Sequence, residues 1–256
     1  EGAKKFLSHF YNQTSYLVDR KIEREGSNFD LNPFHETDDE LAVNLNFRNT
    51  IFFNRGRQHY TTSYSYISTR NKNLLSTGLQ ENKIESHQLN FNHKFEESWL
   101  VTLQQKLNET ESTSENFQNR NYKIEGFTLN PELSYLLSQR TRFNIFYQLE
   151  EQENQLGEQE KLQQNKLGAS FSFNNAQKYS VTGEFNYIYN KYEGDTFSPV
   201  AYQLLQGLQP EKNYTWTLLA QKKLTNYLDL NLSYFGRKSE NSTTIHTGTV
   251  QLRAYF

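Results

Sequence analysis

Short segments in which apolar and polar residues alternate constrain this chain more than any other feature. At the end of the chain, Val250, Leu252 and Ala254 alternate with Gln251 and Arg253. Successive side chains of a β-strand point to opposite faces of its sheet, so this pattern predicts a strand with one apolar and one polar face. Because segments of about ten residues repeat the pattern along the chain, we predict an all-β protein.

Composition excludes several other classes. No stretch approaches the roughly 18 consecutive apolar residues of a transmembrane helix. Hydrophobic residues make up 35% and the mean hydropathy is −0.88, yet aromatic residues reach 15%, which argues against disorder. The net charge of −2 and the lack of a basic stripe give no reason to expect a nucleic-acid partner. Cysteine is absent, which excludes disulfides and thiolate chemistry.

The alternating segments are joined by connections that are short and long in turn. The predicted strands are 41–53, 59–68, 88–95, 99–107, 129–137, 143–149, 167–173, 179–189, 214–220, 228–234 and 244–256. Short turns follow residues 53, 95, 137, 173 and 222, whereas 69–83, 108–120, 150–163 and 190–213 are predicted long loops, with a shorter link at 237–242. Bacterial transmembrane barrels have short turns on one side and long loops on the other. This order favours a transmembrane antiparallel up-and-down β-barrel over a soluble β-sandwich, which is the alternative.

The strand number requires one more strand near the start of the chain. Bacterial single-chain barrels have an even number of strands. Phe6, Phe10, Tyr16 and Val18 supply a candidate that brings the count to twelve. We therefore predict a single barrel domain over residues 1–256. A larger barrel with strands before Glu1 is the alternative, since the chain does not begin with Met and an upstream region is possible.

The end of the chain carries a resemblance to a known class. Phe256, preceded by alternating residues, is similar to the C-terminal signal that the barrel-assembly machinery of Gram-negative outer membranes recognises. Segments 227–234 and 244–256 resemble the ends of large, poorly characterised outer-membrane proteins of Bacteroidota. The resemblance implies a bacterial outer-membrane location with a periplasmic C-terminus, and it implies outer-membrane lipid and the assembly machinery as partners. The residues assigned to this signal are Val250, Leu252, Tyr255 and Phe256.

Aromatic and polar residues divide between the faces of the predicted barrel. Tyr and Trp favour membrane boundaries; we predict Trp99, Tyr179, Tyr227 and Tyr255 at the periplasmic boundary and Tyr189, Tyr192 and Tyr214 at the outer one. The charged residues predicted to face the lumen are Arg48, Lys94, Lys106, Glu184, Asp229 and Arg253. Such a lumen could be a water-filled pore or a closed hydrogen-bond network.

The longest predicted loop contains a helix signal. Ser198-Pro199 is typical of a helix N-cap and first position, and Gly207 is typical of a C-terminal cap. Between and just beyond them, Val200, Leu204, Leu205 and Leu208 form an apolar stripe at helical spacing. We predict that this helix either plugs the barrel mouth or docks a partner, such as another outer-membrane protein.

The sequence shows no convincing catalytic, cofactor or metal constellation. His87, His93 and His246 fall on the predicted lipid face, and His35 lies among acidic loop residues. Acidic groups at 23–40 and 150–160 are predicted as solvated loop charge, with divalent cation binding as the alternative. We therefore predict a non-enzymatic protein without cofactor, acting as a channel or as a membrane-anchored component of a surface complex. The alternatives are an outer-membrane hydrolase and, last, a soluble binding module.

Overall fold

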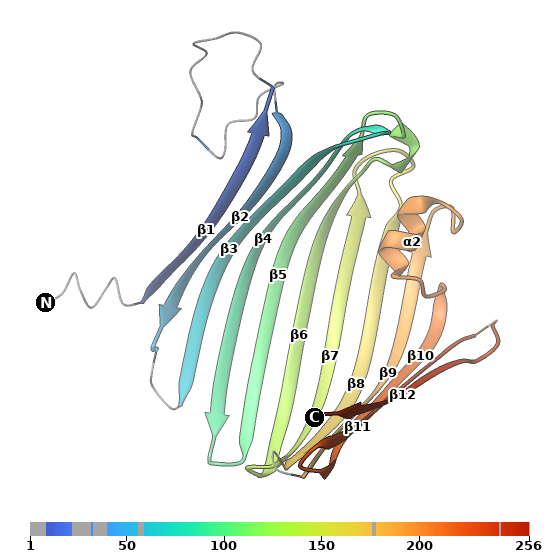
Figure 1. The fold of residues 1–256 in the computed structure, drawn as a ribbon. Helices are drawn as coiled ribbons and strands as arrows, with labels where there is room; N and C mark the ends of the chain where they lie inside the picture. Colours follow the sequence, from blue (N-terminus) through green and yellow to red (C-terminus); the bar gives the residue numbers. More distant parts are fainter. Residues whose placement is uncertain are drawn as a thin grey trace, which may run out of the picture.

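The computed structural model describes residues 9–21, 32, 40–55, 59–175, 178–240 and 242–255 (Figure 1). The strands are β1 Phe10–Arg20, β2 Glu40–Phe53, β3 Tyr60–Leu75, β4 Gly78–Phe95, β5 Trp99–Ser114, β6 Tyr122–Ser138, β7 Thr141–Asn154, β8 Lys161–Asn175, β9 Tyr179–Glu193, β10 Glu211–Thr225, β11 Leu228–Ser239 and β12 Ile245–Ala254. Two short helices complete the order, η1 Gln118–Arg120 and α2 Pro199–Leu205. Neither is long and apolar enough to cross a membrane.

The strands form one antiparallel sheet in chain order. All twelve belong to it, and each pairs with its neighbours in sequence, which confirms the predicted all-β up-and-down fold and its strand number. The strand upstream of residue 41 is β1, in register with β2 from Phe10–Ile51 to Arg20–Glu40. Among the described residues no register pair joins β1 to β12. Phe256 lies outside the described residues, so its predicted role stays a prediction.

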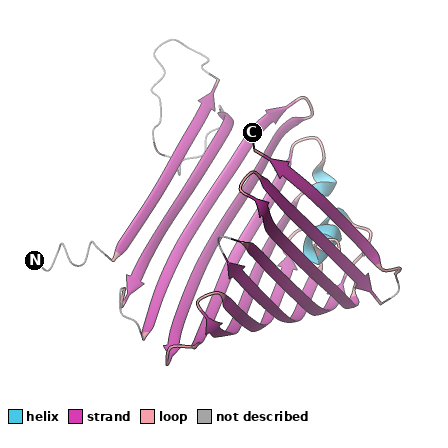
Figure 2. Cartoon of the chain, turned by 60° about the horizontal axis from the view of Figure 1, so that its bottom comes forward, coloured by secondary structure: helices cyan, strands magenta, loops and turns pink. Residues whose placement is uncertain are grey.

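The sheet curls strongly, so its two faces have different surroundings. In Figure 2 the strands around β10–β12 curl in front of the rest of the sheet, and α2 lies in the hollow. The helix packs against Ile124 of β6 and Leu162 of β8, which therefore point to the concave face. On β6 and β8, every second residue counted from these two points to the concave face, and strand register extends this face to the other strands. The residues between them point to the convex face.

Most of the predicted long loops are strand. Segment 69–83 is a continuous hairpin of β3 and β4 with its tip at Ser76–Thr77, and most of 108–120 belongs to β5. Glu150, Glu151 and Glu153, predicted as loop residues, lie on β7. The reason is that backbone hydrogen bonds continue the sheet beyond the apolar positions, where polar side chains obscure the alternation. The true connection after β7 covers only residues 155–160.

The predicted acidic loop at 23–40 lies mostly outside the described residues, as does His35. Glu40 is described, and its assignment as solvated charge was wrong. It begins β2 with 0% exposure and accepts a hydrogen bond of 2.6 Å from the Arg70 guanidinium of β3. A buried carboxylate requires such a partner, because leaving it uncompensated would be strongly unfavourable.

Candidate functional site

The convex face of β4–β9 is apolar over most of its height and ends in charged residues. On β5, Trp99, Val101, Leu103 and Leu107 point this way and are followed by Glu109. The neighbouring strands show the same order from the short turns upward. On β4, residues 95, 91 and 89 lie below Glu85, and on β7, residues 143, 145, 147 and 149 lie below Glu151. On β8 polar convex residues extend below Lys161 to Gln163 and Asn165, but on β4, β5 and β7 the apolar band ends at a glutamate on the side of the longer connections.

At or just beyond this limit lies a row of charged residues in direct register, which we call the boundary row. Its members are Glu85, Glu109, Glu125, Glu153, Lys161 and Glu193, each the cross-strand partner of the next. Like charges directly opposite each other on a sheet are destabilising. Lysine relieves only part of the repulsion: Lys123 Nζ lies 2.9 Å from Glu109 Oε1, and Lys161 Nζ lies 2.9 Å from Glu153 Oε1.

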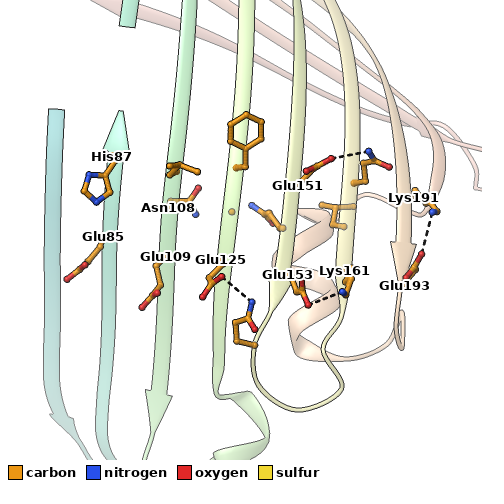
Figure 3. A pocket seen from close by; sticks show the side chains of 17 residues that line it. Glu85, His87, Asn108, Glu109, Glu125, Glu151, Glu153, Lys161, Lys191 and Glu193 are labelled. Carbon is orange, nitrogen blue, oxygen red and sulfur yellow. Dashed lines mark hydrogen bonds and ion pairs between the residues drawn. The ribbon is translucent and has the colours of Figure 1, made fainter. Parts of the chain in front are cut away.

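A groove of about 690 Å³ runs along the boundary row on the convex face (Figure 3). Its apolar lining includes Leu107 and Phe127 at the top of the apolar band, and Gly126 also lines it. Figure 3 places Glu85, Glu109 and Glu125 at one end of the groove, and toward the other end Lys161 and Lys191 together with Glu151, Glu153 and Glu193. The groove therefore combines an apolar side with a mostly acidic row that contains two ion-paired lysines.

A second candidate site lies on the concave face, where α2 is buried. The predicted helix is present, and Val200, Ala201, Leu204 and Leu205 are buried against Ile124 and Leu162. The C-terminal cap is Gln206, one residue before the predicted cap at Gly207, because Gln206 already adopts the left-handed conformation at φ 53°. Leu208 lies beyond the helix, half-buried, so it does not belong to the helical stripe. Since the four buried side chains face strands of the same sheet, the structure places the helix in the hollow.

The N-terminal end of α2 is held by a buried carboxylate. Ser198 caps the helix by accepting from the Ala201 N–H at 3.0 Å, and its hydroxyl donates to Glu160 Oε1 at 3.3 Å. The other oxygen of Glu160 accepts from Asn154 Nδ2 at 2.8 Å. Glu160 is only 3% exposed, so the side chains of the 155–160 connection and of β7 fix the start of the helix. Burial next to this carboxylate also raises the pKa of the Tyr192 phenol, which lies above the apolar band.

The segment after α2 is held by three strands. Arg237 Nη1 of β11 donates to the Gly207 carbonyl at 3.2 Å. Asn190 of β9 and Asn213 of β10 both donate to the Gln209 carbonyl, at 3.0 and 2.8 Å. With both ends bound and its middle packed, α2 is a fixed part of the wall rather than a free loop.

The six predicted lumen residues all lie on the concave face, but they do not form one cluster. They are Arg48 on β2, Lys94 on β4, Lys106 on β5, Glu184 on β9, Asp229 on β11 and Arg253 on β12. Asp229 and Arg253 are direct cross-strand partners, and Glu184 accepts from Asn186 Nδ2 at 2.8 Å. They are dispersed among amides and hydroxyls, which gives the hollow a polar lining of mixed charge.

Two predicted positions of aromatic residues were wrong. Tyr192 faces inward and packs against the α2 cluster rather than lying at the outer boundary, because strand parity places it beside Leu162. Tyr255 donates to Asp229 Oδ2 at 3.3 Å, on the concave side of the sheet. Trp99, Tyr179, Tyr189 and Tyr214 do point to the convex face.

Histidines near the apolar band pair with tyrosine. Tyr64 Oη lies 2.7 Å from His87 Nδ1, and Tyr234 Oη lies 2.8 Å from His246 Nδ1, all on the convex face. Within the described ranges no three His, Asp or Glu side chains are arranged to hold a metal ion. Sequence reasoning missed the register of the boundary row, and its assignment of Glu160 to solvated loop charge was wrong, because that carboxylate is buried against α2.

Comparison with known proteins gives structural likeness only. No family model and no curated protein matches the chain. Among solved structures, the CymD monoaromatic hydrocarbon channel is 9% identical, with 96% of this chain and 78% of that chain covered at a TM-score of 0.45. OmpT, an outer-membrane protein of Vibrio cholerae, is 8% identical, with 96% of both chains covered and a TM-score of 0.45. The NanC porin is 9% identical, with 83% of this chain and 94% of that chain covered and a TM-score of 0.41. These chains are known outer-membrane or channel proteins by name, but similarity at this level assigns no family, and the resemblance to Bacteroidota proteins stays a prediction.

Proposed function

We propose that this chain forms a β-barrel wall in a bacterial outer membrane, with its convex face toward lipid. The apolar band that ends at the boundary row is the observation that carries the proposal. From Trp99 to Leu107 the band covers about 27 Å of strand at about 3.3–3.4 Å per residue. At the usual strand tilt of about 35–45° this projects to about 19–22 Å along the membrane normal, a little less than the apolar band of about 25 Å that outer-membrane barrels present. A soluble sandwich would bury such a face against a second sheet.

The proposal requires that both edges of the sheet be paired in the membrane. Backbone N–H and C=O groups cannot remain unpaired in hydrocarbon, so open sheet edges do not occur there. β1 ascends toward the long-connection side and β12 descends from it, so the two edges have the antiparallel polarity that closure needs. With the usual orientation, the short turns and Ala254 lie on the periplasmic side.

Within this barrel, the concave face supports a channel with a fixed plug. The hollow is lined by amide, hydroxyl and charged side chains, as a path for polar solutes requires. α2 occupies part of its mouth and is bound at both ends. We infer that solutes pass beside the helix and that its position limits their size.

A second candidate function is a membrane-anchored component of a surface complex, and one observation favours it. Phe197 is 94% exposed and Tyr202 is 74% exposed, although both belong to the segment that α2 fixes. Exposed aromatic side chains on a rigid element are typical of protein interfaces. In this reading the buried face of α2 fixes the helix and the exposed aromatics contact the partner.

We propose no enzymatic activity. A hydrolase needs a nucleophile or activated water beside a general base. Of the described histidines, His87 and His246 hydrogen-bond to tyrosines on the convex face, away from the polar hollow. This arrangement supports a structural role for both.

Two measurements test the proposal. A folded outer-membrane barrel should require detergent for extraction and should migrate faster on a gel before boiling than after it. Migration that is independent of boiling, together with solubility without detergent, would contradict the membrane assignment. Reconstitution in a planar bilayer then separates the two candidate functions, because a channel should show discrete conductance steps and a surface-complex anchor should show none.

A further inference from the structure

The middle of the convex face is polar on β1–β3, although it is apolar on most of the other strands. Residues at equal distances from the short turns lie at similar depths, because the turns share one side of the membrane. Positions four to six residues above the turns lie about 9–17 Å up, at about 3.3–3.4 Å per residue and a tilt of about 35–45°, which is the middle of a band of about 25 Å. On β4, β7 and β8 such positions carry the exposed side chains of Leu89, Ile145 and Phe171.

On β1–β3 the same depth is occupied by hydrogen-bonding side chains. Asn49 lies four residues above the lower end of β2, and its cross-strand partners are Asn12 of β1 and Tyr66 of β3. Asn12 Nδ2 donates to Asn49 Oδ1 at 2.5 Å, and Thr14 Oγ1 donates to Asn12 Oδ1 at 3.2 Å. We call Asn12, Thr14, Asn49 and Tyr66 the amide patch. Among the described strands β4–β12, the convex positions at this depth include a single amide, Gln105 of β5.

The amide patch has donors that no neighbouring side chain uses. Each asparagine amide carries two N–H groups, so Asn12 and Asn49 have four. Within the described part of the chain one of the four is bonded, from Asn12 to Asn49, and Asn12 is exposed while Asn49 is half-buried. Hydrocarbon offers no acceptor, so polar side chains at this depth are favoured where another protein surface bonds them. A surface that covers the patch would supply the acceptors.

We propose that the amide patch is the contact surface of a dimer in the membrane, with a second copy of this chain as its occupant. The inference rests on the proposed membrane position of the convex face. Asparagine, threonine and tyrosine side chains each carry both a donor and an acceptor, so the patch is its own complement, as a two-fold interface requires. The four side chains are uncharged at neutral pH, so two identical patches meet without repulsion between charges.

The position of the patch suits such a contact. A two-fold axis along the membrane normal keeps each residue at one depth in both copies, so the amides of one patch face those of the other. Two convex walls meet along a narrow strip, and the three adjacent strands β1–β3 span only about 10 Å (Figure 1). Phe10 and Phe53, which are 42% and 55% exposed at the lower ends of β1 and β2, add apolar contact below the amides.

Cysteine cross-linking in lipid vesicles tests which face meets the second copy. The chain contains no cysteine, so one introduced thiol can be linked only to the same residue of another copy. Thr14→Cys and, separately, Tyr66→Cys keep both asparagines and should give covalent dimers with a short thiol-reactive cross-linker. Ile145→Cys, four residues above the turn on β7, is the control and should remain monomeric. Equal cross-linking at all three positions, or none at either patch position, would overturn the proposal.

Removing the amides tests what holds the two copies together. Asn12→Leu with Asn49→Leu should weaken dimerisation about ten-fold, the size expected of two side-chain hydrogen bonds within a membrane. Sedimentation equilibrium in a density-matched detergent measures the dissociation constant. Gln105→Leu removes the isolated amide on β5 and is the matched control, which should leave that constant unchanged. A wild type that is monomeric at every concentration, or a dissociation constant that the double variant does not change, would overturn the proposal.

Heat-modifiable migration is recorded for every variant and should be retained, because leucine suits a position that faces lipid. A wild type that migrates as a barrel but stays monomeric removes this inference alone. Loss of that migration in the wild type removes the proposed function, and this inference with it.

Discussion

The indole ring of Trp216 lies over Gly236, its direct cross-strand partner on β11. A Cβ atom built on Gly236 would come within 2.0 Å of the ring, so no other residue fits beneath it. Aromatic residues that cover glycine on a neighbouring strand fix the register of a sheet. The pair therefore holds β10 and β11 in the alignment that keeps Leu230 and Leu232 on the convex face.

Gly236→Ala should therefore destabilise the protein by about 1–3 kcal/mol, the usual cost of overpacking. The measurement is the free energy of unfolding in a urea titration of the refolded protein. Gly248→Ala on the adjacent strand is the control, because its Cβ would meet nothing closer than 4.0 Å. Equal losses for both variants would show that the loss of glycine, rather than the contact with Trp216, matters.

The two faces of β11 should respond differently to a charge. Leu230→Arg places a guanidinium on the convex face, which costs about 2–4 kcal/mol near the bilayer midplane. Asn231→Arg points into the polar hollow and should cost much less. Refolding titrations into lipid vesicles measure both, and similar values would mean that the convex face does not contact lipid.

Removing the apolar contacts of α2 should release the helix without unfolding the sheet. Leu204 and Leu205 are 0% and 3% exposed, and each stabilises the packed helix by about 1.5–3 kcal/mol through burial. Leu204→Asp with Leu205→Asp should make the segment 194–210 sensitive to protease while heat-modifiable migration is retained. If α2 is a plug, single-channel conductance should rise; if it docks a partner, co-purification of that partner should fall.

The buried carboxylate of Glu160 should matter more than its exposed neighbour. Glu160→Ala leaves the Ser198 hydroxyl without its acceptor and removes one of the two acceptors of Asn154 Nδ2, which costs about 1–3 kcal/mol for buried polar groups. Faster amide exchange at residues 199–205 is the expected result. Glu158→Ala in the same connection is the control and should leave exchange in α2 unchanged.

The boundary row should limit stability when lipid is absent. Glu125→Gln removes a charge that is in direct register with Glu109 and Glu153, so it should stabilise the protein by about 0.2–1 kcal/mol in detergent. The urea midpoint in a non-ionic detergent measures the effect. A decrease in that midpoint would mean that hydrogen bonding from Gln155, at 3.2 Å, outweighs the repulsion.

The sequence alone determined the up-and-down sheet, its strand number and the helix signal at Ser198–Pro199. These features depend on local properties: alternation follows from the geometry of a single strand, and capping follows from a few neighbouring residues. The missing strand near the start was found by parity, and β1 Phe10–Arg20 confirms it.

Only the tertiary structure decided where the strands end and which charges lie together. The upper parts of β3, β4 and β7 lack a clear apolar alternation, because on that side most convex positions carry charged residues. Pairing with neighbouring strands is what extends these strands. Glu85 and Glu193 are 108 positions apart in the chain, yet register across β4–β9 places them in one row. Tyr192 faces α2 for the same reason, since its face is set by its partner Leu162. Register is a property of strand pairs, so a pattern within one segment cannot specify it.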